Sequence, residues 1–298
     1  MNRTITYIIN EKNENQTIGQ FLKIHGYSHP IIVGLKKTTN GILLNERWVY
    51  VSNRMKKGDV LTINIEETAS NSKLEPVFFP LDIVYEDDDL LIVNKTSNMP
   101  IHPSMGNYEN TLANALAYYF KDQDSPFIFR CINRLDRDTT GLTIIAKNAL
   151  SAAILGRQVS NRSIHRTYLA ICEGNTPPSG TIAAPIARVC DSTIMRCVDF
   201  EHGEQAITHY WQLAYNKTLD LSLIKLKLET GRTHQIRVHM KHAGYPLIGD
   251  FLYHPDNTIL HRQALHSCSL EFEHPVTKEK MHFHAPLPED MECIFPSY

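Results

Sequence analysis

The chain has 298 residues, of which 42% are hydrophobic and 21% are charged, and its formal net charge at pH 7 is −2. These fractions are those of an ordinary soluble globular protein, and the length is sufficient for two domains. The near-zero net charge excludes a chain that is basic throughout, although an uneven distribution of charge still permits binding to a nucleic acid.

The N-terminus and the cysteines favour a cytoplasmic protein. In residues 1–10, MNRTITYIIN, polar residues interrupt the apolar ones, unlike in a signal peptide, and no apolar run approaches the roughly 20 residues that span a bilayer. The six cysteines include no Cys-x-x-Cys pair, whereas zinc sites need closely spaced ligands and disulfide frameworks belong to small secreted domains. We therefore expect reduced thiols, no metal and no membrane association.

Residues 17–66 are predicted to form a separate small unit. Thr17 is a suitable N-cap for a helix over 17–25, whose apolar residues share one face. Pro30 can open a second helix over 31–38. Three short strands are expected to follow, at 41–45, 47–51 and 60–65.

The order of these elements resembles the S-four-type RNA-binding domain. The resemblance is carried by the two helices, by Gly-x-x-x-Asn-Glu-x-x-Val at 41–49, and by Lys-Lys-Gly-Asp at 56–59 before a closing strand. One departure is Ser-His-Pro at 28–30, where that domain usually has a Ser-Arg pair. The unit is locally basic, as contact with phosphates requires. The cations that we assign to RNA binding are Lys36, Lys37, Arg54 and Lys57.

A linker is predicted at 67–79, and it divides the chain into an RNA-binding part, 1–75, and a larger domain, 76–298. The larger domain is predicted to have strands at 83–85, 90–94, 143–146, 167–172, 206–214 and 221–228 and helices at 111–120 and 150–159. Strands and helices that mix without regular alternation favour an α+β fold. We expect a mainly antiparallel mixed β-sheet in the larger domain and a small α/β domain at the N-terminus.

The segment 131–147 contains the main candidate for catalysis. Asp136 stands between Arg134 and Arg137, before a polar turn. Nearby positive charge favours the ionised form of a carboxylate, which suits a nucleophile or an electrostatic stabiliser. The alternative, from composition alone, is a surface aspartate in a turn. From 147 to 166 the chain has four cations and no Asp or Glu, which fits a large, structured polyanion or, alternatively, a solvated helix face.

This segment resembles the catalytic motif of the RluA/RluD class of pseudouridine synthases, which is roughly His-Arg-Leu-Asp-x-x-Thr-Ser-Gly-Leu. Asn133 stands in place of the usual His, and Thr140 in place of the usual Ser. Further segments resemble motifs of this class in the right order, and several separated motifs weigh more than one. They lie at 90–95 with 101–104, 166–170, 230–240, 244–250, 263–266 and 284–290.

The resemblance implies a reaction and roles for three residues. Pseudouridine forms when the glycosidic nitrogen–carbon bond of a uridine breaks and the uracil turns and rejoins through carbon 5, which needs no redox step, metal or cofactor. Asp136 would be the nucleophile, at the ribose or at the ring. Arg237 would be its ion-pair partner, with Arg232 as the alternative. Tyr168 would stack on the base and take part in proton transfer.

The same resemblance implies an RNA substrate and an RNA-binding surface. The reacting uridine must leave its stack, and Arg134 is placed to occupy the vacated space. Arg137, Arg166 and Arg232 are the other cations that we expect to contact RNA. An S-four-type domain is commoner among the members that modify rRNA, so we expect large-subunit rRNA as the substrate, with tRNA as the alternative. We expect a monomer.

Structural explanations exist for each candidate. Tyr168 by itself would more often be a core tyrosine, and the arginines would be salt-bridge partners. Three histidines at 234, 239 and 242 could suggest a metal site, but their spacing differs from His-Glu-x-x-His and no carboxylate accompanies them. Two rival functions are a glycoside hydrolase, which needs a close pair of carboxyl groups such as Asp136 and Asp138, and an RNA-binding protein without catalysis.

Overall fold

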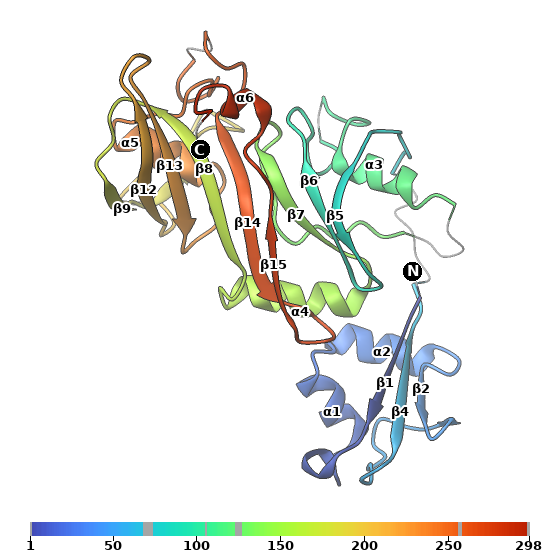
Figure 1. The fold of residues 1–298 in the computed structure, drawn as a ribbon. Helices are drawn as coiled ribbons and strands as arrows, with labels where there is room; N and C mark the ends of the chain where they lie inside the picture. The colour runs from blue at the N-terminus through green and yellow to red at the C-terminus, as the bar shows by residue number, and fades with distance from the viewer. Residues whose placement is uncertain (1, 68–73, 105, 123–126, 256–257, 297–298) are drawn as a thin grey trace.

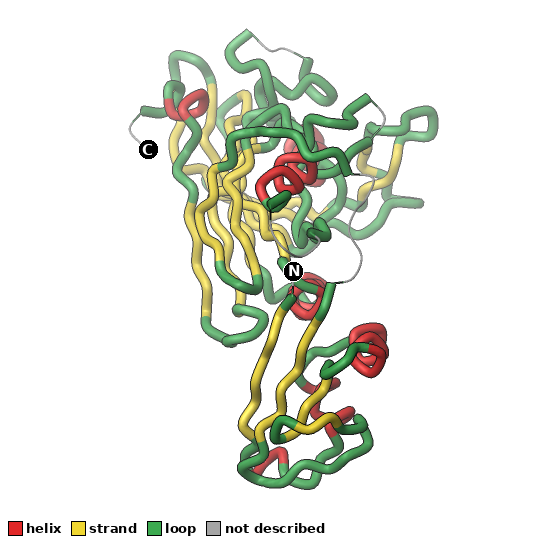
Figure 2. The backbone as a smooth tube through the Cα atoms, turned by 90° about the vertical axis from the view of Figure 1, so that its right-hand side faces the viewer, coloured by secondary structure: helices red, strands yellow, loops and turns green. Residues whose placement is uncertain are grey.

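The computed structural model describes residues 2–67, 74–104, 106–122, 127–255 and 258–296. Two main sheets form the protein: a large one, and a smaller one at the N-terminus that lies below helix α4 (Ala149–Ser160) in Figure 1 and below the large sheet in Figure 2. No helix in this described part has the length and apolar character needed to cross a membrane. All six cysteines are free thiols.

The N-terminal sheet is antiparallel and has the strand order β1-β4-β2-β3. Alternate residues of its central strand β4 are buried, and two helices pack with them in one apolar cluster. The first helix begins at the predicted cap, where Thr17 and Gln20 form a reciprocal capping box. The elements are β1 (Arg3–Ile8), a 3₁₀ turn (Glu11–Asn13), α1 (Ile18–Ile24), α2 (His29–Lys37), β2 (Ile42–Leu44), β3 (Arg47–Trp48) and β4 (Val60–Ile65).

Strand β1 was not predicted, and the small unit therefore extends beyond residues 17–66. β1 pairs with β4 along its whole length, with Ile5 opposite Ile63, and both side chains are buried. A single strand with two-residue alternation becomes stable only through a partner, and this partner lies more than fifty residues later in the chain. Glu67, the first residue of the predicted linker, is buried; residues 68–73 of that linker lie outside the described residues.

The large sheet has the order β5-β6-β7-β14-β8-β13-β12-β9, and β15 also pairs with β14. Its neighbouring strands are antiparallel except for β7 and β14. This arrangement confirms the predicted α+β fold. The strands are β5 (Asp82–Glu86), β6 (Leu90–Lys95), β7 (Thr140–Ala146), β8 (His165–Glu173), β9 (Ser179–Ala183), β12 (Ile207–Asn216), β13 (Leu221–Leu228), β14 (Leu265–Glu273) and β15 (Lys280–His284).

Helices and one hairpin complete the larger domain. Helices α3 (Leu112–Tyr119) and α4 coincide with predicted ones, whereas α5 (Gln235–His242) and α6 (Glu289–Glu292) were not predicted. A short hairpin of β10 (Ile186–Arg188) and β11 (Arg196–Val198) stands apart from the large sheet. Strands β9, β14 and β15 were also missed. Helix α5 lies largely within the motif segment 230–240, for which no helix was predicted.

Candidate active site

Asp136 lies in a tight loop that enters the central strand β7. The backbone N–H of Thr139 donates to the Asp136 carbonyl at 3.2 Å, which closes the turn. At Gly141, φ is +110°, and a Cβ there would lie 2.3 Å from the carbonyl oxygen of Ser267 on β14. Only glycine fits this approach, and the start of β7 therefore fixes the position of the aspartate loop.

The carboxylate of Asp136 forms an ion pair with Arg237 of α5. Arg237 Nη1 donates to Asp136 Oδ2 at 2.9 Å, and the arginine side chain is only 2% exposed. Its Nε and Nη2 donate to the two carboxylate oxygens of Asp250 at 2.7 Å each. Burial by itself would lower the pKa of Arg237, but Asp250 and Asp136 raise it. The guanidinium is thus a charged bridge between two carboxylates.

The loop after Asp250 supports this bridge. Asp250 Oδ1 also accepts the backbone N–H groups of Leu252 and Tyr253, at 3.1 and 3.2 Å. The Tyr253 ring lies 5.0 Å from the Arg237 guanidinium, a distance typical of a cation–π contact. The Tyr253 hydroxyl is 2.9 Å from Nδ1 of His234. The guanidinium therefore has little freedom to turn away from Asp136.

His234, one of the three histidines considered above for a metal site, lies beside the candidate nucleophile. Its Nε2 is 3.9 Å from Asp136 Oδ2. Burial lowers the pKa of His234 against the opposing effect of Asp136, and thus disfavours the charged imidazolium. Its backbone has φ of +57°, in the left-handed region, directly before α5. The motif segment 230–240 thus places both His234 and Arg237 at Asp136.

Tyr168 lies on β8 and lines a small recess of about 60 Å³ together with Asp136 and Arg237. Leu228 and Leu265 supply apolar walls on either side. Tyr168 is buried, and its hydroxyl makes no hydrogen bond with any residue that the structure describes. The three residues predicted to be catalytic therefore line one recess.

A cleft of about 1030 Å³ lies next to this recess and is rich in arginine. Asp136 and Glu229 are its acidic lining residues. An excess of guanidinium groups around one concave surface favours a polyanionic ligand. The arginines that line the cleft are Arg134, Arg137, Arg162, Arg166, Arg188, Arg196 and Arg232.

Two of the predicted electrostatic relationships differ in the structure. Arg137 does not flank the carboxylate of Asp136, because its guanidinium pairs with Asp138 at 2.9 Å. Arg232, the alternative partner of Asp136, pairs with Glu204 instead. Consecutive residues of a tight turn point in different directions, so neighbours in the chain need not be neighbours in space. The cation at Asp136 comes from α5.

The predicted RNA-binding cations of the N-terminal unit lie outside this cleft. Lys36 and Lys37 are exposed on the last turn of α2. Arg54 and Lys57 lie in the loop before β4, where Arg54 donates to the carbonyl of Asn15 and Lys57 pairs with Glu11. Lys36 and Lys37 form no ion pair with the described residues, so they remain available for a phosphate.

Lys95, at the end of β6, is a further residue at the site whose role the sequence did not predict. Its Nζ donates to the carbonyls of Thr96 and Arg137, at 2.8 and 2.9 Å. Burial lowers the pKa of Lys95 to about 7, against the opposing effect of Asp138 and Asp136. Lys95 thereby ties the backbone beside Asp136 to β6. Both Lys95 and Asp250 lie within the motif segments 90–95 and 244–250, and this position was the indication in the sequence that they have a role at the site.

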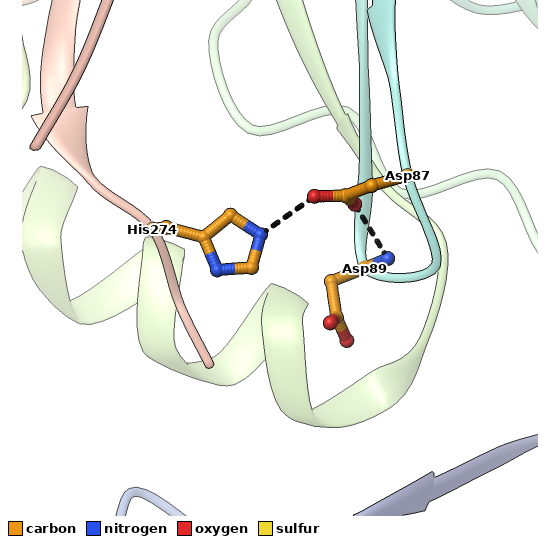
Figure 3. A group of neighbouring side chains, drawn as sticks. All are labelled: Asp87, Asp89 and His274. Carbon is orange, nitrogen blue, oxygen red and sulfur yellow. Dashed lines mark hydrogen bonds and ion pairs between the residues drawn. The ribbon is translucent and has the colours of Figure 1, made fainter. Parts of the chain in front are cut away.

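One cluster outside the site has the composition of a metal site: Asp87, Asp89 and His274 (Figure 3). Asp87 accepts hydrogen bonds from two backbone N–H groups, from Tyr85 and from His274 Nε2. Although burial opposes ionisation, these bonds lower the pKa of Asp87. Nδ1 of His274 accepts backbone N–H groups, so its proton is on Nε2.

The oxygens of Asp89 are also occupied. Oδ2 accepts from Arg3, and Oδ1 accepts from Arg3, Asn148 and Ser151. A metal would have to displace these donors from both carboxylates. The cluster is therefore a hydrogen-bond network, and its chemistry does not fit a metal centre.

A half-buried aspartate paired with a buried arginine, at the edge of an arginine-lined cleft, is an arrangement that suits an enzyme acting on a polyanion. The family described as RNA pseudouridylate synthase matches residues 89–242. The uncharacterized RNA pseudouridine synthase YhcT of Bacillus subtilis (strain 168) is 37% identical over 99% of this chain and 98% of its own. The chain belongs to the RNA pseudouridylate synthase family and is, by that membership, an RNA-modifying isomerase.

Other relatives agree with this assignment. The ribosomal large subunit pseudouridine synthase D of Zymomonas mobilis is 39% identical over 81% of this chain and 80% of its own. Among solved structures, human RNA pseudouridylate synthase domain containing 1 matches with a TM-score of 0.59 and 29% identity, over 70% of this chain and 83% of that one.

Proposed function

We propose that the protein isomerises specific uridines of structured RNA to pseudouridine with Asp136 as the covalent nucleophile and without a cofactor. The observation that carries this proposal is the asymmetric pairing of Asp136. Arg237 holds Oδ2, whereas Oδ1 makes no hydrogen bond with any residue in the described part of the chain. One oxygen is thus fixed by an ion pair, and the other can form a bond to the substrate in the recess that Tyr168 lines.

The proposed reaction conserves all atoms. The bond between N1 of the uracil and C1′ of the ribose breaks, and a bond between C5 and C1′ replaces it. N1 gains a proton and C5 loses one. Asp136 attacks either C1′ or the uracil ring. A bond to C1′ breaks as the C5–C1′ bond forms, and a bond to the ring breaks after C5 has joined C1′. Tyr168 stacks on the uracil, and its hydroxyl takes part in the proton transfer.

The cleft arginines bind the RNA that surrounds the target. The uridine leaves its stack, at a cost of a few kcal/mol, and Arg134 fills the vacated space. Arg137, Arg166 and Arg232, which line the cleft, contact phosphates and determine the position of the strand. These roles rest on the cleft geometry and on the family's chemistry.

The substrate is large-subunit rRNA, with tRNA as the alternative. The names of the synthase D relatives support this substrate. We propose further that residues 1–75 provide an S-four-type RNA-binding domain, with Lys36, Lys37, Arg54 and Lys57 as its contacts, and that 76–298 are the catalytic domain. The protein acts as a monomer in the cytoplasm, where ribosomal RNA is modified.

The experiment is to incubate the purified protein with large-subunit rRNA and with tRNA transcripts. Pseudouridine formation is mass-silent and creates a uridine isomer that reacts with carbodiimide. A glycoside hydrolase would release uracil, and a protein that only binds RNA would leave the transcript unchanged. Either of these results contradicts the proposed function.

A further inference from the structure

Helix α4 belongs to two cores at once. Its residues Leu150 and Ile154 are buried in the apolar cluster that α1, α2 and β4 form in the N-terminal unit. The neighbouring Leu155 is buried in the cluster of the large sheet, with residues of β6, β7 and β14. The N-terminal unit therefore packs on α4, and separating the two would expose apolar surface on both.

The turn between α1 and α2 is shaped for this contact. Gly26 has φ of +101°, and a Cβ there would lie 2.6 Å from Ile154 and 2.7 Å from the guanidinium of Arg157. Arg157 donates to the Gly26 carbonyl. A larger residue at position 26 would thus be strained and would also meet α4, whereas glycine permits the close approach.

Two largely buried ion pairs hold the opposite side of the contact. Arg3 of β1 binds Asp89 through Nε at 3.1 Å and Nη2 at 2.8 Å. Asp89 lies in the turn between β5 and β6 (Figure 3) and is 2% exposed. Asn148 and Ser151, at the start of α4, donate hydrogen bonds to its carboxylate. Glu67 pairs with Arg130 at 2.8 Å and accepts the backbone N–H of Ala149.

These ion pairs resist separation of the two units. Loss of Arg3 from the contact would leave the buried Asp89 carboxylate without its cation. Together with the shared apolar cluster, the pairs oppose both undocking and rotation. Asp89 thus links Arg3 of the N-terminal unit to Asn148 and Ser151 at the start of α4.

The other end of the same helix borders the active-site cleft. Val159, Ser160 and Arg162, at and just beyond the end of α4, line the cleft that contains Asp136. A helix of 12 residues is about 18 Å long. The N-terminal unit and the cleft are therefore connected through one short, rigid element.

We propose that the N-terminal unit is docked at a fixed orientation, and that Arg3 and Asp89 are specificity-determining residues. This inference rests on the proposed function and on RNA binding by the N-terminal unit. Because the orientation of the unit is fixed, an RNA bound to it presents a uridine to Asp136 at a fixed distance from the bound element. The preferred substrate is accordingly a folded RNA with two elements, a helical or loop element on the unit and the target loop in the cleft. A short stem–loop lacks the first element and does not report on the docking.

The test compares two RNAs with three variants. The RNAs are a large-subunit rRNA transcript and a short stem–loop that carries only the target uridine. Arg3→Gln removes the ion pair to Asp89, and Gly26→Val disturbs the contact with α4 without a change of charge. Lys217→Gln, in the exposed turn after β12, is the control for net charge. Small-angle scattering measures docking, and pseudouridine mapping measures site choice.

We expect Arg3→Gln and Gly26→Val to increase the radius of gyration and to modify the stem–loop within about twofold of the wild-type rate. On the long transcript, the ratio of target to other uridines should fall by about tenfold or more, because a loosely held unit no longer gives a defined effective concentration. The control should change neither measurement. If Gly26→Val fails to fold, Arg3→Gln alone decides the question.

Two results would overturn the inference. One is unchanged site choice in a variant whose radius of gyration has increased, and the other is an unchanged radius in Arg3→Gln. If the wild-type protein modifies neither RNA, the proposed function fails, and that result is distinct from a loss of selectivity.

Discussion

Asp136 and Arg237 lie 101 positions apart in the chain and form an ion pair of 2.9 Å at the edge of the arginine-lined cleft. The pair is asymmetric, since Arg237 contacts one carboxylate oxygen of Asp136 and both oxygens of Asp250. Asp250 thereby holds the plane of the guanidinium, and the guanidinium holds Asp136.

Asp136→Asn should fold and bind RNA normally but form no detectable pseudouridine. The amide is nearly isosteric with the carboxylate, but it is not a nucleophile. Asp138→Asn is the matched control, because Asp138 pairs with Arg137 instead. That variant should retain turnover. Carbodiimide mapping measures the product, and turnover by Asp136→Asn near that of the wild type would show that the nucleophile is misassigned.

Arg237→Met and Asp250→Asn should each destabilise the protein by about 3–5 kcal/mol, because each leaves buried charge without its partner. Both should lower turnover more than RNA affinity. The double variant should lose less than the sum of the two losses, with a difference of about 0.5–3 kcal/mol that is typical of residues in contact. Denaturant unfolding of the four proteins provides the cycle, and strictly additive losses would contradict the shared bridge.

Tyr168→Phe should leave stability and RNA affinity close to those of the wild type. The hydroxyl has no hydrogen-bond partner among the described residues, and phenylalanine keeps the stacking ring. Turnover should fall by about 10²–10⁴-fold if the hydroxyl takes part in proton transfer. Single-turnover kinetics separates this loss from weaker binding. Normal turnover would assign Tyr168 to stacking alone.

Lys95→Met should destabilise the protein, and the deficit should grow with pH. Burial lowers the pKa of Lys95 to about 7, so between about pH 7 and 10 the unfolded chain binds more protons at this residue than the folded one. Wild-type stability therefore rises through this window relative to the variant, with a slope of at most about 1.4 kcal/mol per pH unit.

Below about pH 7 the difference should be constant, since the lysine is charged in both states. Two opposing contributions make up this constant difference. The variant leaves two carbonyls without a donor, a loss of about 1–3 kcal/mol each, whereas the wild-type protein bears the free-energy cost of burying a charged lysine. Urea unfolding at several pH values measures both regimes. A deficit that is independent of pH would mean that Lys95 stays protonated throughout.

Local patterns were sufficient for much of the fold. The cap at Thr17 and the apolar run of β7 predicted their elements because a helix start and a buried strand depend on neighbouring residues. The α+β class followed from the irregular alternation of such elements. Strand β1 and helix α5 escaped prediction, since β1 is stabilised by a partner distant in sequence and α5 lies within a segment interpreted as a motif.

The sequence by itself determined the family and the candidates Asp136, Tyr168 and Arg237, because the motifs that carry them are continuous in the chain. Only the tertiary structure decided how they pair. In the folded protein Arg137 pairs with Asp138, Asp250 binds Arg237, and Arg3 binds Asp89. Such pairs depend on the register of the sheets and on the packing of α4 and α5, and residue spacing along the chain contains no direct measure of either.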